Sequence, residues 1–442
     1  MYDYIWKLLE KREKPIDVIV AGLGFMGFGF VSAVRNVVGM RVPLLISRRP
    51  KESKKYLEER GFKVKIESNP QKIKDFADKG YICVSDDLSL IETYENEVVL
   101  EMTGTVAYGT EIGLRTVKAR KHFITMNPEL QEVAGTELKK LADLYGVVIT
   151  DVVGDQPGSL TRMISQAKMQ GFKVLVAGNM KRYMDRHATQ VKMQPWADDK
   201  GLNVRQTVSF TDGTKQSIEM SLVANYLGMD LLQFGMKGPQ VEDIKEVLDK
   251  FNWNEIPEGG IVDYVIGLKL FPGIFLIVEH KDPHQAKYLR YLGLGDGPRY
   301  VLFEPYHLCH LDVAGTIAKV VLFRQETINN STNPRTKTIA VAKFDLKKGQ
   351  KLDGIGGNLV YGNIDKIESS DGFLPVGLSD GAILKNDIHQ DQPIKLIDVD
   401  LPDNAATRLL GFLTQSNSNG ENFEEKKVER RPTWLRALHI LG

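Results

Sequence analysis

The chain has 442 residues, with 58 Lys and Arg against 57 Asp and Glu, so its formal net charge is +1. This length suits two or three domains with cores of their own, and the balanced charge gives no indication of nucleic acid or an anionic membrane as a partner. The two cysteines, Cys83 and Cys309, exclude a disulfide framework and a zinc-finger pattern and fit a reducing cytoplasm.

The N-terminal residues 1–14 mix aromatic and aliphatic side chains with charged ones, which predicts a short amphipathic helix without the apolar centre of a signal peptide. No apolar run along the chain approaches the roughly 20 residues that span a bilayer.

Residues 18–27 (VIVAGLGFMG) join an apolar run to glycines at a G-x-G-x-x-G spacing. In this motif the first glycine permits the turn after a buried strand, the second leaves room for a pyrophosphate, and the third lets the next helix pack closely. The N-terminus of that helix favours phosphate, so the spacing predicts a dinucleotide site; the alternative is a glycine-rich turn without a ligand. The predicted cofactor residues here are Gly22, Gly24, Phe25, Met26 and Gly27.

A second predicted strand, 41–47, ends in Ser47, Arg48 and Arg49. NAD-binding folds usually place a carboxylate at this point to bind the adenosine ribose. Here two guanidinium groups are available for a 2′-phosphate, which favours NADP. The alternative interpretation is a solvated strand end.

Further apolar strands alternate with helical patterns as far as residue 153, which predicts a doubly wound parallel sheet of Rossmann type. The loops that leave two of these strands contain Thr103 with Gly104, and Asn127, and cofactor binds at such strand ends. A further exit, residues 154–158 (GDQPG), allows two interpretations: Asp155 and Gln156 lie beside the nicotinamide, or Asp155 only caps the next helix.

In the middle of the chain, 204–208 has the pattern of a strand, and a helix is predicted over 216–226. The turn at Asp212 and Gly213 places Lys215 at the start of this helix, with Glu219 one turn beyond on the same face. The pair is either an exposed ion pair or, if buried, a unit suited to proton transfer.

Two histidines, at 307 and 310, flank Cys309 at a spacing that matches no zinc pattern. A helix over 314–323 is expected to return to the first domain. The polar stretch 329–335 predicts a linker, and a mostly-β region follows, with strands over 337–342 and 394–399. A polar, charged segment at 417–428 and a final helix at 434–438 complete the expected elements.

Several motifs together resemble a known family. They are 122–127 (HFITMN), 154–158, 212–215 (DGTK) with 218–225, and 295–298 (GDGP) with 305–308 (PYHL). This set resembles the homoserine dehydrogenase-like oxidoreductases that carry a C-terminal SAF domain, in particular the 1-deoxy-D-xylulose-5-phosphate reductoisomerase-like (DRL) family. The resemblance implies a Rossmann domain over 1–158 completed by about 311–328, an inserted α/β substrate and oligomerisation domain over 159–310, and a mostly-β SAF-like domain over 336–442.

The resemblance also implies a function. It is NADP-dependent hydride transfer between NADPH and a small polyhydroxylated substrate, with or without a phosphate. The conversion of 1-deoxy-D-xylulose 5-phosphate to 2-C-methyl-D-erythritol 4-phosphate in isoprenoid biosynthesis is one such reaction. A divalent cation such as Mg or Mn, a homodimer or homotetramer, and a cytoplasmic location are expected. The alternatives are a simple homoserine dehydrogenase-like enzyme, and a cofactor-bound sensor or scaffold that uses the SAF domain.

The site residues predicted from the motifs and the resemblance fall into two groups. The catalytic candidates are Lys215, Lys181, Asp155, Asp212 and Glu219, and the substrate-binding candidates are Gln156, Asn179, Arg182, Tyr306 and His307. The chain departs from the family where reductoisomerase-like members read Gly-Lys-Gly-Thr-Lys-Tyr, because it has GNMKRY at 178–183. That departure leaves the substrate open.

Overall fold

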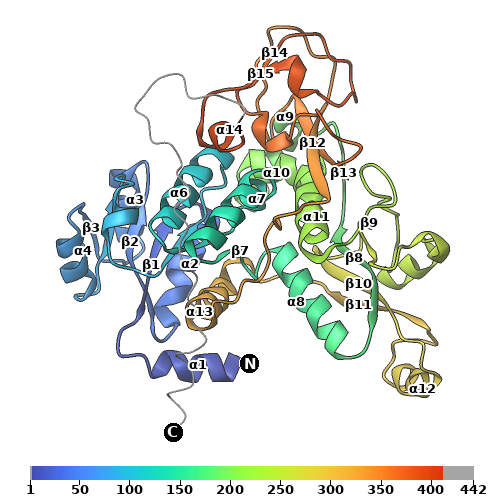
Figure 1. Cartoon of the computed structure of the whole chain (residues 1–442), viewed down its shortest axis with the longest axis horizontal. Coiled ribbons are helices and arrows are strands. Elements are labelled where there is room, and N and C mark those ends of the chain that lie inside the picture. The colour runs from blue at the N-terminus through green and yellow to red at the C-terminus, as the bar shows by residue number, and fades with distance from the viewer. Residues whose placement is uncertain (1, 412–442) are drawn as a thin grey trace.

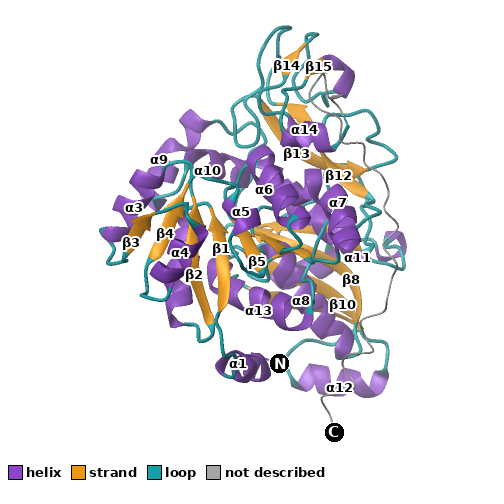
Figure 2. Ribbon diagram, turned by 60° about the vertical axis from the view of Figure 1, so that its left-hand side comes forward, coloured by secondary structure: helices purple, strands orange, loops and turns teal. Residues whose placement is uncertain are grey.

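The computed structural model describes residues 2–411, and the elements expected at 417–428 and 434–438 lie outside this range. Its first sheet has seven parallel strands in the order β3-β4-β2-β1-β5-β6-β7, with helices on both faces (Figures 1 and 2). The predicted doubly wound parallel sheet is therefore confirmed. The strands are β1 (Ile16–Ala21), β2 (Met40–Ile46), β3 (Val64–Ile66), β4 (Ile82–Ser85), β5 (Val98–Glu101), β6 (His122–Thr125) and β7 (Ile149–Asp151).

The helices of this region begin with the predicted amphipathic helix α1, which buries Ile5 and Leu9. Most of the others follow a strand and return the chain over the sheet, which is the crossover that parallel strands require. They are α1 (Tyr2–Glu10), α2 (Phe25–Ala33), α3 (Pro50–Glu58), α4 (Pro70–Ala77), α5 (Leu90–Thr93), α6 (Val106–Lys118), α7 (Pro128–Tyr145) and, much later in the chain, α13 (Val313–Phe323), with the 3₁₀ turn η1 (Val34–Asn36).

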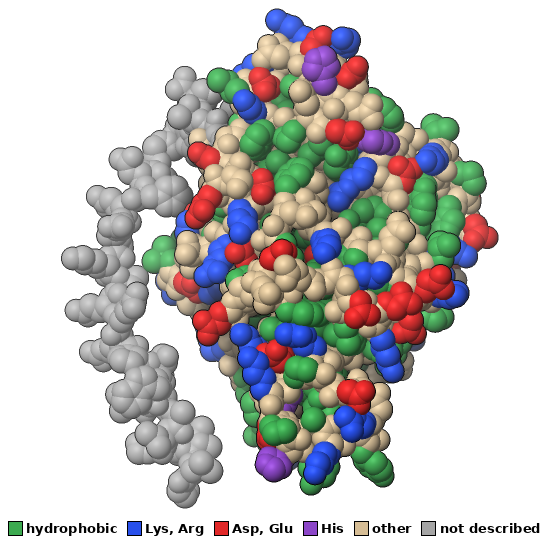
Figure 3. Space-filling model, turned by 90° about the vertical axis from the view of Figure 1, so that its right-hand side faces the viewer, with side chains coloured by type: hydrophobic (Ala, Val, Ile, Leu, Met, Phe, Trp, Pro, Cys, Tyr) green, Lys and Arg blue, Asp and Glu red, His purple; other side chains and the backbone are tan. Residues whose placement is uncertain are grey.

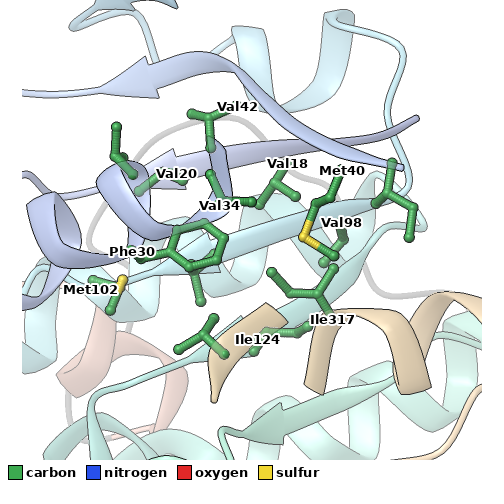
Figure 4. Close-up of a cluster of buried hydrophobic side chains, with 14 of the residues drawn as sticks. Val18, Val20, Phe30, Val34, Met40, Val42, Val98, Met102, Ile124 and Ile317 are labelled. Carbon is green, nitrogen blue, oxygen red and sulfur yellow. The ribbon is translucent and has the colours of Figure 1, made fainter. Parts of the chain in front are cut away.

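Helix α13 completes the first core, as the sequence predicts. Its Ile317 packs with Phe30 of α2, Val18 of β1 and Ile124 of β6 in one buried cluster (Figure 4). Beyond α13, the Ile328 carbonyl accepts a hydrogen bond from the Asp151 N–H at 2.7 Å, next to the edge strand β7.

The second region is built on a four-stranded mixed sheet in the order β11-β10-β8-β9, in which only β8 and β9 are parallel. Its elements are α8 (Gln156–Met169), β8 (Lys173–Lys181), α9 (Gln190–Lys200), α10 (Val204–Thr211), α11 (Thr214–Leu227), η2 (Ile244–Asp249), η3 (Trp253–Glu255), β9 (Ile261–Ile266), β10 (Gly273–Glu279), α12 (Pro283–Tyr291), β11 (Arg299–Glu304) and η4 (Cys309–Leu311).

The predicted strand over 204–208 is wrong, because this segment is the start of helix α10. The Asn203 side chain caps it by accepting the Arg205 N–H at 2.9 Å, and Val208 packs with Ala188 and Met193 in a small core of its own. A cap and a local apolar contact thus override the β preference of the valines.

A smaller C-terminal β module follows, which we define as residues 336–411. It contains β12 (Thr336–Ala342), β13 (Val360–Lys366), η5 (Val376–Leu378), β14 (Ile383–Leu384), η6 (Leu396–Asp398), β15 (Val399–Asp400) and α14 (Ala405–Leu409). The predicted strand over 394–399 is mostly wrong, since 396–398 form a 3₁₀ turn and only Val399 belongs to a strand.

The polar stretch 329–335 that leads into this module is not a solvated linker. Asn330 is buried and donates to the Glu132 carbonyl, while Asn225 of α11 donates to the Asn330 side chain at 2.8 Å. The module also shares its core with Val133 of α7 and Ile218 of α11. Its position against both sheets is therefore fixed by packing and by buried hydrogen bonds.

Two surface properties agree with the composition. On the face shown in Figure 3, acidic and basic side chains are interspersed with apolar ones. Within residues 2–411, no helix has both the length and the apolarity needed to cross a bilayer.

Candidate functional site

The glycine turn after β1 has the geometry of a dinucleotide-binding loop. Gly22 has a φ of +101°, and a Cβ there would lie 2.7 Å from the Met102 carbonyl oxygen. A Cβ on Gly27 would lie 2.2 Å from the Gly22 oxygen, so α2 packs directly on the turn. Gly24, the N-cap of α2, faces open space with no atom within 4 Å of its Cβ position. That space before a helix N-terminus suits a pyrophosphate.

Beside this turn lies a cleft of about 360 Å³, which we call the dinucleotide cleft. The Arg48 guanidinium lies 5.3 Å from the centre of the Tyr108 ring, and Arg49 pairs with Glu52 at 2.9 Å. Glu52, which the sequence analysis missed, offsets one of the two predicted cations. The lining residues are Gly22, Leu23, Gly24, Ile46, Ser47, Arg48, Arg49, Glu52, Ser53, Tyr56, Met102, Thr103 and Tyr108.

The two helix residues predicted for the cofactor, Phe25 and Met26, start α2, and Phe25 is 64% exposed. The predicted loop residues Thr103 and Asn127 meet through a carboxylate that was not predicted. The buried Glu101, at the end of β5, accepts the Thr103 N–H at 2.6 Å and the Asn127 amide at 3.4 Å. Burial raises the pKa of Glu101, while these donors oppose the shift. The neighbouring Gly104 is exposed, with a φ of +68°.

A second group of residues converges on Lys215 at the start of α11, and we call it the Lys215 cluster. Lys215 Nζ lies 3.6 Å from Glu129 Oε1, 3.7 Å from Glu219 Oε1 and 4.0 Å from Asp155 Oδ2. The cluster also includes Asp151 and Lys181, both of which interact electrostatically with Lys215. Its members come from α7, α11, β7, β8 and the turn before α8.

Asp155 caps helix α8, as one of the two interpretations predicts, and it also lies near Lys215; its place beside the nicotinamide stays a prediction. One carboxylate oxygen caps α8 by accepting the Gln156 N–H at 3.1 Å, while the other faces Lys215 and has no hydrogen-bond donor. The Asn179 amide donates to Gln156 Oε1 and to Glu219 Oε2, at 2.8 Å each. Asn179 and Gln156 therefore hold Glu219 in place behind Lys215.

The electrostatics distinguish the two lysines. Burial lowers the pKa of Lys215, but Asp155, Glu129, Glu219 and Asp151 act against it and leave the net pKa raised. For Lys181, burial dominates and its pKa is lowered. Burial also raises the pKa of Glu219 to about 7, with both lysines opposing the shift. The charged form is thus favoured for Lys215, whereas Lys181 loses its proton more readily.

Several predicted site residues lie outside this cluster, among them Asp212, Arg182 and Tyr306. Asp212 is fully buried and pairs with Lys343 of the C-terminal β module at 2.9 Å, whereas the carboxylates that pair with Lys215 are Glu129, Asp155 and Glu219. Arg182 is next to Lys181 but belongs to a different pocket, where its Nε donates to the Leu270 carbonyl at 2.7 Å. Tyr306 is 58% exposed.

The loop around Cys309 is packed against the turn that carries Asp155. Cys309 N–H donates to the Gly154 carbonyl at 3.1 Å, and His307 Nδ1 lies 2.9 Å from the same oxygen. Burial raises the pKa of Cys309 to about 12, and Asp155 adds to the shift. Among residues 2–411, no group of three or more His, Cys, Asp or Glu side chains is arranged to hold a metal ion.

The cluster contains two carboxylates that the sequence analysis missed. Glu129 follows the predicted loop residue Asn127 by two positions, and Asp151 lies inside the strand predicted to end at residue 153 but is the last residue of the observed strand β7. A carboxylate at the carboxyl end of an apolar parallel strand was the available signal for Asp151 and for Glu101.

The chain is similar to known oxidoreductases. Residues 154–313 match the family described as "Oxidoreductase DRL, catalytic domain". The homoserine dehydrogenase of Lactococcus lactis is 21% identical over 357 residues, which cover 73% of this chain and 80% of that protein. Two solved structures are similar at low identity. A probable dehydrogenase from Thermotoga maritima has a TM-score of 0.44 at 13% identity, with coverage of 70% of this chain and 90% of that one. A DOX-P reductoisomerase solved with magnesium has a TM-score of 0.35 at 15% identity, with coverage of 71% and 70%.

Proposed function

We propose that this NAD(P)-dependent oxidoreductase, whose residues 154–313 match the DRL catalytic-domain family, uses NADPH to reduce the carbonyl of a small polyhydroxylated substrate at the Lys215 cluster. The single observation that carries the proposal is the position of Lys215. Its ammonium group is surrounded by carboxylates beside the strand ends where the dinucleotide cleft also lies.

The residues of the dinucleotide cleft fit NADP. The open space at Gly24 and the N-terminus of α2 suit the pyrophosphate, while Arg48, which has no carboxylate partner in the described structure, suits a 2′-phosphate. Thr103 and Asn127, held by Glu101, would contact the nicotinamide end. When bound, the cofactor supplies a hydride to the substrate carbonyl carbon.

Lys215 and Lys181 have different roles in the reduction of the carbonyl. Because Lys215 keeps its charge, it stabilises the negative oxygen that develops on the reduced carbonyl. Because the pKa of Lys181 is lowered, Lys181 is the better donor of the proton that this oxygen takes up. Glu219, Asp155 and Glu129 hold the Lys215 ammonium and can accept hydrogen bonds from substrate hydroxyls.

An anionic group on the substrate fits away from this cluster, where four carboxylates face only two ammonium groups. The pocket of about 670 Å³ at the carboxyl ends of β8 and β9 is lined by the cations Arg182, Lys250 and Lys269 and by the carboxylates Glu242 and Glu246. Lys269 pairs with Glu242, while Arg182 and Lys250 form no ion pair in the described structure. Arg182 directly follows Lys181 in the chain.

The test has two steps. NADPH fluorescence is titrated with the purified protein, and oxidation of NADPH is then followed with sugar phosphates, including 1-deoxy-D-xylulose 5-phosphate, hydroxy-aldehydes and aspartate semialdehyde. Reduction of a sugar phosphate supports the proposal, and reduction of the semialdehyde alone supports the simple homoserine dehydrogenase-like alternative. NADPH binding without turnover of any carbonyl would favour the sensor alternative and reject the proposal.

The same assay, with and without EDTA and added Mg²⁺ or Mn²⁺, tests the predicted divalent cation. We also propose a homodimer or homotetramer formed through the region of the four-stranded sheet, to be measured by sedimentation at micromolar concentration. A SAF-like identity of the C-terminal β module and a cytoplasmic location remain part of the proposal.

A further inference from the structure

We infer that Lys343, in the C-terminal β module, is a positioning residue that sets the place of Lys215 through a buried ion pair with Asp212. This inference rests on the proposed role of Lys215. It gives the module a part in the reaction although none of its residues belongs to the Lys215 cluster.

The first step is the burial of Lys343. Its side chain is fully buried, and its Nζ donates to the carbonyls of Ala188 at 2.7 Å and Gly357 at 2.8 Å while it pairs with Asp212 at 2.9 Å. A buried ammonium with three oxygen partners is fixed in one position, and the loss of one member of such a pair leaves an uncompensated charge.

The second step leads from Asp212 to the helix that carries Lys215. Asp212 Oδ1 accepts the Thr214 N–H at 2.9 Å, and Thr214 is the first residue of α11. Gly213, between them, has a φ of +82°, and a Cβ there would lie 3.0 Å from the Arg186 side chain. The turn before Lys215 therefore has little freedom to relax without moving the helix start.

A second contact fixes the same point from the module. The Gly362 N–H of β13 donates to Thr214 Oγ1 at 2.8 Å, and α11 packs along β12 and β13 (Figure 1). The module thus contacts the residues on the N-terminal side of Lys215 through the Lys343–Asp212 pair and the Gly362–Thr214 bond. Of the three carboxylates within 4.0 Å of Lys215 Nζ, Glu219 lies one turn further along α11, while Glu129 and Asp155 come from α7 and the N-cap of α8, outside the module.

The test uses the full-length protein with two readouts, turnover with NADPH and amide hydrogen exchange over residues 212–219. Lys343→Met is expected to lower kcat by about 10- to 100-fold, as for a small misplacement of a catalytic group, with NADPH affinity unchanged. Exchange at the start of α11 is expected to accelerate.

A matched variant separates positioning from general loss of stability. Lys121 is another buried lysine, which donates to the carbonyls of Ile91 at 2.6 Å and Tyr94 at 2.5 Å in the first sheet region. Lys121→Met is expected to lower the melting temperature but to leave the kcat of the folded protein and the exchange at α11 unchanged.

The double variant Lys343→Met with Asp212→Asn removes both charges and is expected to recover melting temperature while kcat stays low. A folded Lys343→Met protein with normal kcat would overturn the inference, and so would recovery of kcat in parallel with stability. If the unsubstituted protein reduces no carbonyl, the proposed function fails. Amide hydrogen exchange is then the remaining readout. Unchanged exchange over 212–219 in Lys343→Met would show that the module does not fix the start of α11.

Discussion

The dinucleotide cleft and the Lys215 cluster differ in how the chain builds them. The cleft combines a turn over 22–27 with the exits of β2 and β5, and its two arginines are exposed to solvent. The Lys215 cluster takes one or two residues from each of five places; Asp151, Asp155 and Glu219 are buried, and Lys215, Lys181 and Glu129 are half-buried. Charges act weakly in the first environment because water screens them, and strongly in the second. Substitutions should therefore have small effects in the cleft and large ones in the cluster.

The largest effect is expected for Lys215→Met. If its cation stabilises the developing negative oxygen, kcat should fall by about 100- to 1000-fold, as for the loss of an oxyanion donor. NADPH affinity should stay within about twofold, because Lys215 does not line the cleft. The measurement is turnover and NADPH titration of the purified variant. Near-normal turnover, together with an inactive Lys181→Met protein, would move the role to Lys181.

Lys181→Met should lower kcat by about 100-fold, within the range for a general acid. Its lowered pKa means that the native enzyme loses the proton-donating form as pH rises through that pKa. The alkaline fall in kcat should therefore be present in the native protein and absent from the variant. A variant whose pH profile keeps the same alkaline limb would show that another group donates the proton.

Glu219→Gln should change stability in a pH-dependent way. The folded-state pKa of about 7 lies above the ordinary value of 4.5, so protonation of Glu219 stabilises the native protein fully below about pH 4.5. This contribution is lost as pH rises through 7. The variant has no titrating group at this position. Its free energy of unfolding, relative to that of the native protein, should therefore rise by on the order of 1–3 kcal/mol between pH 5 and pH 8.

Thermal unfolding at several pH values measures this difference. Glu132→Gln is the matched control, since burial also raises the pKa of Glu132 to about 7, outside the Lys215 cluster. Both variants should change the pH dependence of stability, but only Glu219→Gln should change the pH dependence of kcat. A Glu219→Gln protein whose stability follows the native pH curve would contradict the assignment.

The smallest effect is expected in the cleft. Arg48→Ala should weaken NADPH binding about fivefold, because an exposed phosphate contact contributes about 1 kcal/mol, and should leave NADH binding unchanged. Arg49→Ala should do less, since Arg49 already pairs with Glu52, and Glu52→Gln should slightly strengthen NADPH binding. Titrations with both cofactors provide the comparison. Equal affinity of the unsubstituted protein for NADPH and NADH would remove the basis for NADP preference.

The difference between the locally built cleft and the Lys215 cluster, which tertiary packing assembles, also explains which site residues the sequence could predict. Gly22, Gly24 and Gly27 act through local backbone geometry, so their spacing alone indicated the turn. Lys215 and Glu219 share one helix face, and their proximity also followed from spacing. Glu129 and Asp151 approach Lys215 only through tertiary packing, which no local pattern records.

Asp212 is a residue whose structural partner a local sequence motif does not identify. Its place in a DGTK motif suggested catalysis, but its partner Lys343 lies 131 positions later in the chain, and only the fold brings the two together.

No element was predicted from the sequence where helices α9 and α12 lie. An internal proline interrupts α9, and α12 has no buried residue, so neither has a clear apolar stripe.

The return of residues 313–328 to the first sheet has a consequence for synthesis. The seven strands are complete at residue 151, yet the core between them and α2 lacks Ile317 until α13 has been made. Domains usually fold in order as the chain leaves the ribosome. Here the apolar face that α13 covers stays exposed while more than 150 further residues are translated, and the first core is completed only after the region of the four-stranded sheet has been made.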